Sequence, residues 1–224
     1  MLLLIVNFMF LLLSSLIAKK FYSYPLDNQY ILPEKHIGFS NSAVNIWNFL
    51  FVALISFIEL YFTLTASTII IESLIVVFTL LVNYTDFRYY LIPLEINILF
   101  LAVSIVGLFI KIYHHRVNES VILSSHLIFA FLILTALVAI KWSYIKFRNI
   151  NPLGNGDLII MASSFLLLGP VRSIFMLLTA SILGIMIYLV TMLVKRKKII
   201  IPFGPLLLSA TAILFLINPF NSFF

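Results

Sequence analysis

Two aspartates stand at the edges of long apolar runs, where an ionised side chain is costly. Asp86 ends such a run in "FTLLVNYTDFRYYLIP", and Asp157 begins one in "NPLGNGDLIIMASSFLLLGP". Acids in this position must reach water, pair or share a proton, which makes them functional candidates. Two carboxyl groups held together can act as acid and base, because both cannot stay ionised at close range. The alternative is that each merely marks a helix end, with Asp157 as a cap.

The composition places these acids in a membrane protein. The chain has 224 residues, of which 63% are hydrophobic and 10% charged, with a mean hydropathy of +1.17. Such values are far outside the range of soluble domains. The absence of cysteine excludes disulfides, thiolate nucleophiles and cysteine zinc sites. The net charge of +6 comes from short basic runs between apolar segments, which indicates topology signals and no nucleic-acid partner.

Apolar segments of about the length of a bilayer predict an all-α fold, a polytopic transmembrane bundle of about eight helices. Six or seven spans remain open, because some breaks between segments are weak. Residues 1–224 form a single integral membrane domain, in which 19–45 is a short cytoplasmic loop between the first two helices. The first segment reads as a retained helix. The predicted segments are 2–18, 46–64, 67–85, 93–112, 121–141, 157–169, 172–194 and 203–220.

The distribution of lysine and arginine predicts the orientation. In an eight-helix arrangement, eleven basic residues, including the run Lys195 to Lys198, fall on one side of the membrane. Only Lys111, Arg116 and Arg172 fall on the other side. The first side is therefore expected to be cytoplasmic. Since one helix ends at Asp86 and another begins at Asp157, both acids are expected at the cytoplasmic face.

Glycines precede the second aspartate in "PLGNGD". Gly154 and Gly156 allow positive φ and the close approach of another chain, which suits a substrate backbone laid beside a carboxylate. A phosphate-binding loop does not fit, since no lysine follows and an aspartate would repel phosphate.

Three local patterns resemble the membrane aspartyl proteases that share a Gly-x-Gly-Asp motif, and within them the type IV prepilin peptidases. They are Asp86 followed by Ile92-Pro93, then Gly154 to Asp157 with Gly169 closing a short helix, and "IPFGPLLLSA" at 201–210. The resemblance covers residues 75 to 218 and implies that Asp86 and Asp157 are the catalytic pair. The residues that it implies as motif or substrate-path support are Pro93, Gly154, Gly156, Pro202, Gly204 and Pro205.

The resemblance also implies a substrate and a place. The enzyme would be an aspartic endopeptidase that removes the basic leader from prepilin-like or pseudopilin-like proteins at the cytoplasmic face of the inner membrane. Its partners would be a substrate with an apolar N-terminal helix, and membrane lipids. Such enzymes serve type IV pili, protein secretion or competence. No cofactor is needed.

The sequence departs from the family pattern in places. The 19–45 loop holds no cysteine, whereas bacterial members commonly carry a zinc-binding insert there that is linked to N-methylation. We therefore expect neither zinc nor N-methyltransferase activity. The family often has a lysine two residues after the second aspartate, where this chain has Ile159. It also often has an acid directly after Ile-Pro, where this chain has Leu94 and then Glu95.

Two other functions remain open. A signal-peptide-peptidase or presenilin-like protease also pairs two aspartates, but Thr85 separates Tyr84 from Asp86 and the C-terminal Pro-Ala-Leu is missing. A transporter could use the two acids as a proton or cation site. The acids Glu59, Glu72 and Glu95 are weaker candidates, and the histidines share no spacing that predicts a metal site.

Overall fold

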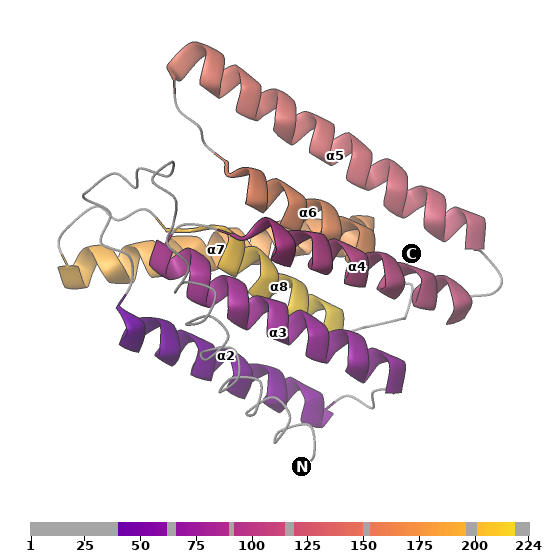
Figure 1. Ribbon diagram of the computed structural model, residues 1–224, viewed down its shortest axis with the longest axis horizontal. Helices are drawn as coiled ribbons and strands as arrows, with labels where there is room; N and C mark the ends of the chain where they lie inside the picture. The colour runs from indigo at the N-terminus through magenta and orange to yellow at the C-terminus, as the bar shows by residue number, and fades with distance from the viewer. Residues whose placement is uncertain are drawn as a thin grey trace.

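The computed structural model describes residues 40–61, 66–89, 92–114, 119–149, 153–195 and 201–217. Within these ranges the chain is helical, and the helices run roughly along a common direction (Figure 1). The helices are α2 (Asn41–Tyr61), α3 (Ala66–Tyr89), α4 (Leu94–His114), α5 (Glu119–Arg148), α6 (Asn155–Leu168), α7 (Pro170–Lys195) and α8 (Gly204–Ile217).

The predicted all-α fold is confirmed, with seven helices in the described residues where the sequence predicted about eight. The predicted first helix, 2–18, and most of the 19–45 loop lie outside the described residues. Helix α2 begins at Asn41, before the predicted start at 46, and α5 continues beyond the predicted end at 141 to Arg148.

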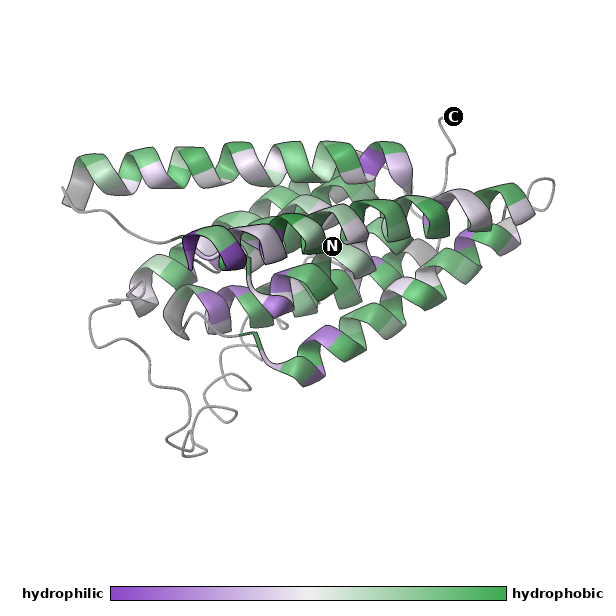
Figure 2. Ribbon diagram, turned by 90° about the horizontal axis from the view of Figure 1, so that it is seen from above, coloured by the Kyte–Doolittle hydropathy of each residue, from purple (hydrophilic) through white to green (hydrophobic). Residues whose placement is uncertain are grey.

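Among the described residues, four helices are long and apolar enough to cross a membrane, and hydrophobic residues extend along most of their length (Figure 2). The candidate spans are Ile69–Phe87, Leu94–Tyr113, Ser120–Arg148 and Pro170–Leu193, whereas α2, α6 and α8 carry shorter apolar stretches. Only 11% of the spans in α5 and α7 is buried by other parts of the protein. Their exposed apolar side chains, such as Phe131 and Leu193, suit contact with lipid tails.

Helix α8 is the centre of the core. It packs against α2, α3, α6 and α7, and it lies between α3 and α7 in Figure 1. Most of its residues are buried, from Gly204 at its start to Leu216 near its end. The start of α8 is therefore held firmly against the neighbouring helices.

A sharp junction joins α6 to α7. Gly169 follows α6 with φ 80° and ψ 179°, and Pro170 begins α7. This backbone conformation is open essentially to glycine alone. A buried polar link stabilises the junction, because His126 Nδ1 lies 2.7 Å from the carbonyl oxygen of Leu166 and its Nε2 lies 3.3 Å from Lys111 Nζ. This link joins α4, α5 and the end of α6 that is distant from Asp157.

Candidate active site

Asp86 lies in the last turn of α3 and is only 6% exposed. The helix continues through it to Tyr89, so its carboxyl group is carried by a regular backbone. The neighbouring Thr85 and Phe87 are also buried. Asp86 therefore faces the interior of the bundle and not the lipid.

Asp157 lies in the first turn of α6, and its carboxylate accepts a hydrogen bond from the backbone N–H of Gly154 at 3.3 Å. This contact satisfies one of the N–H groups that a helix start leaves without a partner. The other carboxyl oxygen, Oδ1, is buried and accepts no hydrogen bond of normal geometry from the described residues. One oxygen of Asp157 is thus fixed by the helix and the other is available for chemistry.

The two glycines before Asp157 are needed for space. The sequence predicted positive φ here, but Gly154 is extended with φ −63° and ψ 150°, and Gly156 lies within α6. A Cβ on Gly154 would lie 3.0 Å from Oδ2 of Asp157, and one on Gly156 would lie 3.1 Å from Cβ of Ile92. Neither glycine uses the positive φ that the sequence allowed, and each leaves space for a side chain of the protein itself. The approach of a substrate backbone at this place stays a prediction.

Gly204, the first residue of α8, brings the two acids together. A Cβ at this position would lie 2.9 Å from Oδ2 of Asp86 and 3.1 Å from Oδ1 of Asp157. The separation of the two carboxyl oxygens is therefore no greater than these two distances added together. The backbone amide of Gly204 adds a polar interaction with each acid. Glycine is required because any side chain would fill the space between them.

The prolines singled out in the sequence define where the surrounding helices begin. Pro93 directly precedes α4, and its carbonyl oxygen accepts the hydrogen bond from the N–H of Asn97 at 3.3 Å. Pro202 and Pro205 are buried on either side of Gly204. Proline is favourable at a helix start because the N–H that it lacks would have no helical partner there. The prolines thus fix where α4 and α8 start.

A comparison with protein-family models matches residues 73–189 to the type IV leader peptidase family. The chain belongs to this family. The match covers about half of the sequence and includes both aspartates and the Gly-x-Gly-Asp segment. No match was found among curated proteins or among solved structures.

Membership of this family favours the peptidase hypothesis over the transporter hypothesis. The resemblance to type IV prepilin peptidases is therefore confirmed at the level of the family. The protein is a leader peptidase-like protease with helices that can span a membrane.

The three glutamates that were weaker candidates lie away from the two aspartates or have side chains outside the described residues. Glu72 is buried on α3 about four turns before Asp86, or about 21 Å along the helix axis. Glu95 is exposed at the start of α4, and the side chain of Glu59 is outside the described residues. Among the described residues, no group of three histidine or acidic side chains could hold a metal ion.

Two polar residues near the site were missed by the sequence analysis. Lys141 on α5 donates a hydrogen bond from Nζ to Oδ1 of Asn155 at 2.5 Å. Asn97 on α4 is 2% exposed, its Nδ2 lies close to Gly156, and its Oδ1 has no hydrogen-bond partner among the described residues. A polar residue within an apolar run was the available signal for Asn97. Lys141 had been counted only as a topology signal.

Proposed function

We propose that this protein is a membrane-embedded aspartyl endopeptidase that removes the basic leader of a prepilin-like or pseudopilin-like protein at the cytoplasmic face of the membrane. The observation that carries the proposal is the meeting of the Asp86 and Asp157 carboxyl groups beside Gly204. Membership of the type IV leader peptidase family supplies the class of substrate. The excess of basic residues at the end of the bundle that holds the acids supports the cytoplasmic orientation.

The arrangement suits general acid and base chemistry. In the proposed reaction, Asp157 is ionised and removes a proton from a water molecule as that water attacks the scissile carbonyl carbon. Asp86 is protonated and donates its proton to the carbonyl oxygen, which gives a tetrahedral intermediate. Two acids at short range favour this division, because they share one negative charge more easily than they carry two. The Oδ1 of Asp157, which lies beside Gly204 and accepts no hydrogen bond of normal geometry from the described residues, is the atom best placed to accept the proton of the water.

An apolar groove offers a place for the substrate's own helix. Helices α2 and α7 both pack on α8, but their backbones do not approach each other closely in the described residues, and a channel lies between them. Two cavities of about 100 and 210 Å³ follow this channel and share Trp47. The first also reaches Phe87, the neighbour of Asp86. We propose that apolar side chains of the substrate enter here, which would place its leader junction beside the two acids.

Two buried polar atoms in the groove favour a polypeptide over lipid tails. The indole Nε1 of Trp47 and the hydroxyl of Ser209 are buried without a hydrogen-bond partner in the described residues, and both residues line the larger cavity. An acyl chain offers no acceptor for either group. A peptide carbonyl or a hydroxyl side chain does, and an unsatisfied polar group in an apolar environment is costly.

The experiment is a cleavage assay on small proteins that have a short basic leader followed by an apolar helix. Each candidate is co-expressed with the wild-type enzyme or with the variants Asp86→Asn and Asp157→Asn, and its mass is measured. Wild type should release the leader, and each variant should lower the rate by about 10²-fold or more, the usual contribution of a general acid or base. Glu95→Gln, which replaces an exposed acid, is the matched control and should retain the rate.

The accumulation of each variant in the membrane, measured by immunoblot, separates a lost reaction from a lost protein. Rapid leader cleavage by either asparagine variant at normal abundance would exclude the proposed pair. Cleavage by none of the proteins, together with uptake of a solute that depends on Asp86, would favour the transporter.

A further inference from the structure

Lys141 occupies an unusual position for a lysine in a membrane helix. It lies about two turns, or about 10 Å, before the end of α5 at Arg148. Most of α5 is exposed towards lipid, and lysines in such helices usually extend their charge to the nearest interface. Lys141 is partly buried, and its Nζ donates a hydrogen bond to the side chain of Asn155, an exposed residue at the start of α6.

The bond places a cation at the first turn of the helix that carries Asp157. Asn155 is the first residue of α6 and stands between the two glycines that precede Asp157. The ammonium group also interacts electrostatically with the carboxyl group of Asp157. The charged neighbour of Asp86 is Asp157 itself.

The other charged residues on the elements around α6 do not duplicate this contact. Helix α8 has none, and Glu95 on α4 is exposed. Lys111 and Arg172 interact with His126 at the other end of α6. Asp86 lies beside Asp157 at Gly204, and its negative charge opposes the effect of the lysine.

Asp86 and Asp157 perform different tasks in the proposed reaction, so their protonation should be unequal. A cation close to one acid makes them unequal, since it stabilises the ionised form of that acid more than that of its partner. The start of α6 acts in the same direction, because the N-terminal end of a helix dipole favours a negative charge.

We propose that Lys141 is a positioning residue for the aspartate pair, which anchors the first turn of α6 through Asn155 and directs the negative charge to Asp157. This inference rests on the proposed peptidase function.

The test compares purified full-length Lys141→Met and Lys141→Arg with wild type in a cleavage assay across a range of pH, on a substrate that wild type is known to cut. Lys141→Met should lower kcat by about tenfold, which corresponds to about 1.4 kcal/mol, with little change in KM. The acid limb of its pH–rate profile should move to higher pH by roughly half to one unit, since an acid that has lost a nearby cation ionises at higher pH. Lys141→Arg should restore most of the rate.

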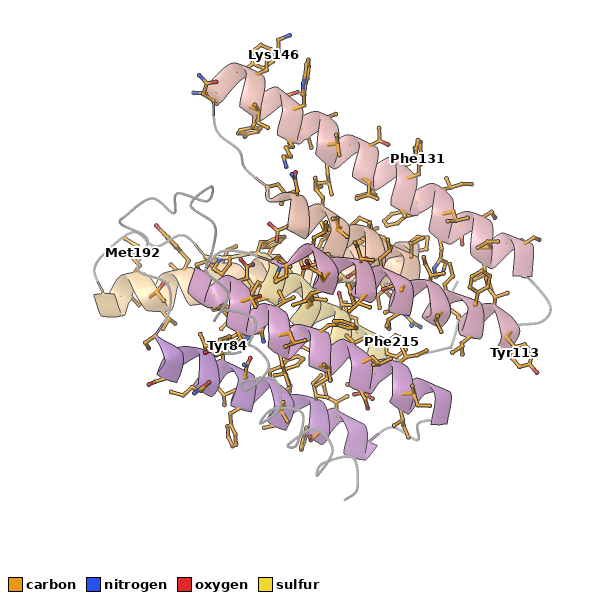
Figure 3. All side chains as sticks on the ribbon, in the orientation of Figure 1. Tyr84, Tyr113, Phe131, Lys146, Met192 and Phe215 are labelled. Atoms are coloured by element: carbon orange, nitrogen blue, oxygen red, sulfur yellow. The ribbon has the colours of Figure 1, made fainter. Side chains whose placement is uncertain are left out.

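Lys146→Met is the matched control. Lys146 is on the same helix, but it packs its ammonium over the ring of Trp142 at 4.9 Å and lies on the side of α5 that faces away from α6 (Figure 3). Its loss should change neither kcat nor the acid limb. An acid limb that stays in place in Lys141→Met, or that moves equally in Lys146→Met, would overturn the role of the charge.

A second measurement tests the anchor without any substrate. The thermal midpoints of Lys141→Met, Asn155→Leu and the double variant are compared in detergent. If the bond stabilises α6, the double variant should lose clearly less than the two single losses combined. Additive losses would refute the anchor. Failure of wild type to cut any leader would refute the proposed peptidase function and leave this second result standing on its own.

Discussion

The carboxyl groups of Asp86 and Asp157 converge on one glycine, Gly204, which comes from a third part of the chain. Their nearest oxygens lie 2.9 and 3.1 Å from the point where a side chain at 204 would begin. Three helices therefore have to be assembled correctly before the pair exists: α3 and α6 bring the acids, and α8 brings the glycine between them. The site is a product of tertiary packing and not of a single motif.

The first prediction concerns Gly204→Ala. The new methyl group would also lie 2.6 Å from Cδ1 of Ile92, so it has no free space and must push the carboxyl groups apart. We expect leader cleavage to fall by at least about tenfold, because small displacements of reacting groups are costly in catalysis. Gly184→Ala is the control, since its methyl group meets only the end of the Leu206 side chain at 3.2 Å. Equal activity of the two variants would contradict the placement of Gly204.

The second prediction concerns the junction at Gly169. Gly169→Ala should destabilise the protein by about 1–3 kcal/mol, because an alanine is strained in this backbone conformation. The loss should be larger still if the imidazole of His126 has to move, since its Nε2 lies 2.5 Å from the new Cβ position. Thermal unfolding in detergent measures the effect.

A double-mutant cycle separates the two causes of that loss. In a His126→Ala background the steric conflict is absent, so Gly169→Ala should cost only the backbone strain. An equal cost in both backgrounds would show that His126 does not restrict residue 169.

The sequence predicted the helices well, because helices of this kind depend on local patterns, and it singled out the two acids whose carboxyl groups the structure brings together. A run of apolar residues of bilayer length predicts a span wherever it occurs. The break at Gly169-Pro170 was visible for the same reason, since glycine ends helices and proline begins them. The structure confirms this break, with α6 ending at Leu168 and α7 beginning at Pro170.

The end of α5 was missed because hydropathy and helix formation are different properties. The predicted segment stopped at Lys141, the first charge, whereas the backbone hydrogen bonds of the helix continue to Arg148. Residues 142 to 148 include three aromatic and two basic side chains, which suit a membrane interface. With the helix ended too early, Lys141 looked like a residue at a boundary, and its bond to Asn155 could not be foreseen.

The reasons for the glycines also required the structure. The spacing of Gly154 and Gly156 indicated an unusual backbone, but both have ordinary dihedral angles and are restricted by what lies next to them. Which atoms lie there depends on α3, α4 and α8, and a single sequence does not give their packing. Of the glycines in the described residues, Gly169 alone has a positive φ.

A third prediction tests the orientation of the chain. Because the sequence has no cysteine, single cysteines can be introduced without first removing any. Probes at Ser40, Asn149 and Lys197 should react with a membrane-impermeant thiol reagent only from the cytoplasm, and a probe at His115 only from outside. The count of basic residues on the two sides predicts this result. Labelling of Asn149 from outside would place the aspartates at the opposite face and rule out a cytoplasmic cut.

The last prediction is that leader cleavage requires no zinc and leaves the new N-terminus unmethylated. A structural zinc site usually has four cysteine or histidine ligands. The chain has no cysteine, and the 19–45 loop, where longer relatives carry their zinc-binding insert, contains the single histidine His36. Enzyme treated with a chelator and checked for metal should therefore cleave at the untreated rate. Mass spectrometry of the product, formed with S-adenosylmethionine present, should show an unmodified terminus. Loss of cleavage on removal of stoichiometric zinc would contradict the first half, and a one-methyl mass increase that depends on the enzyme would contradict the second.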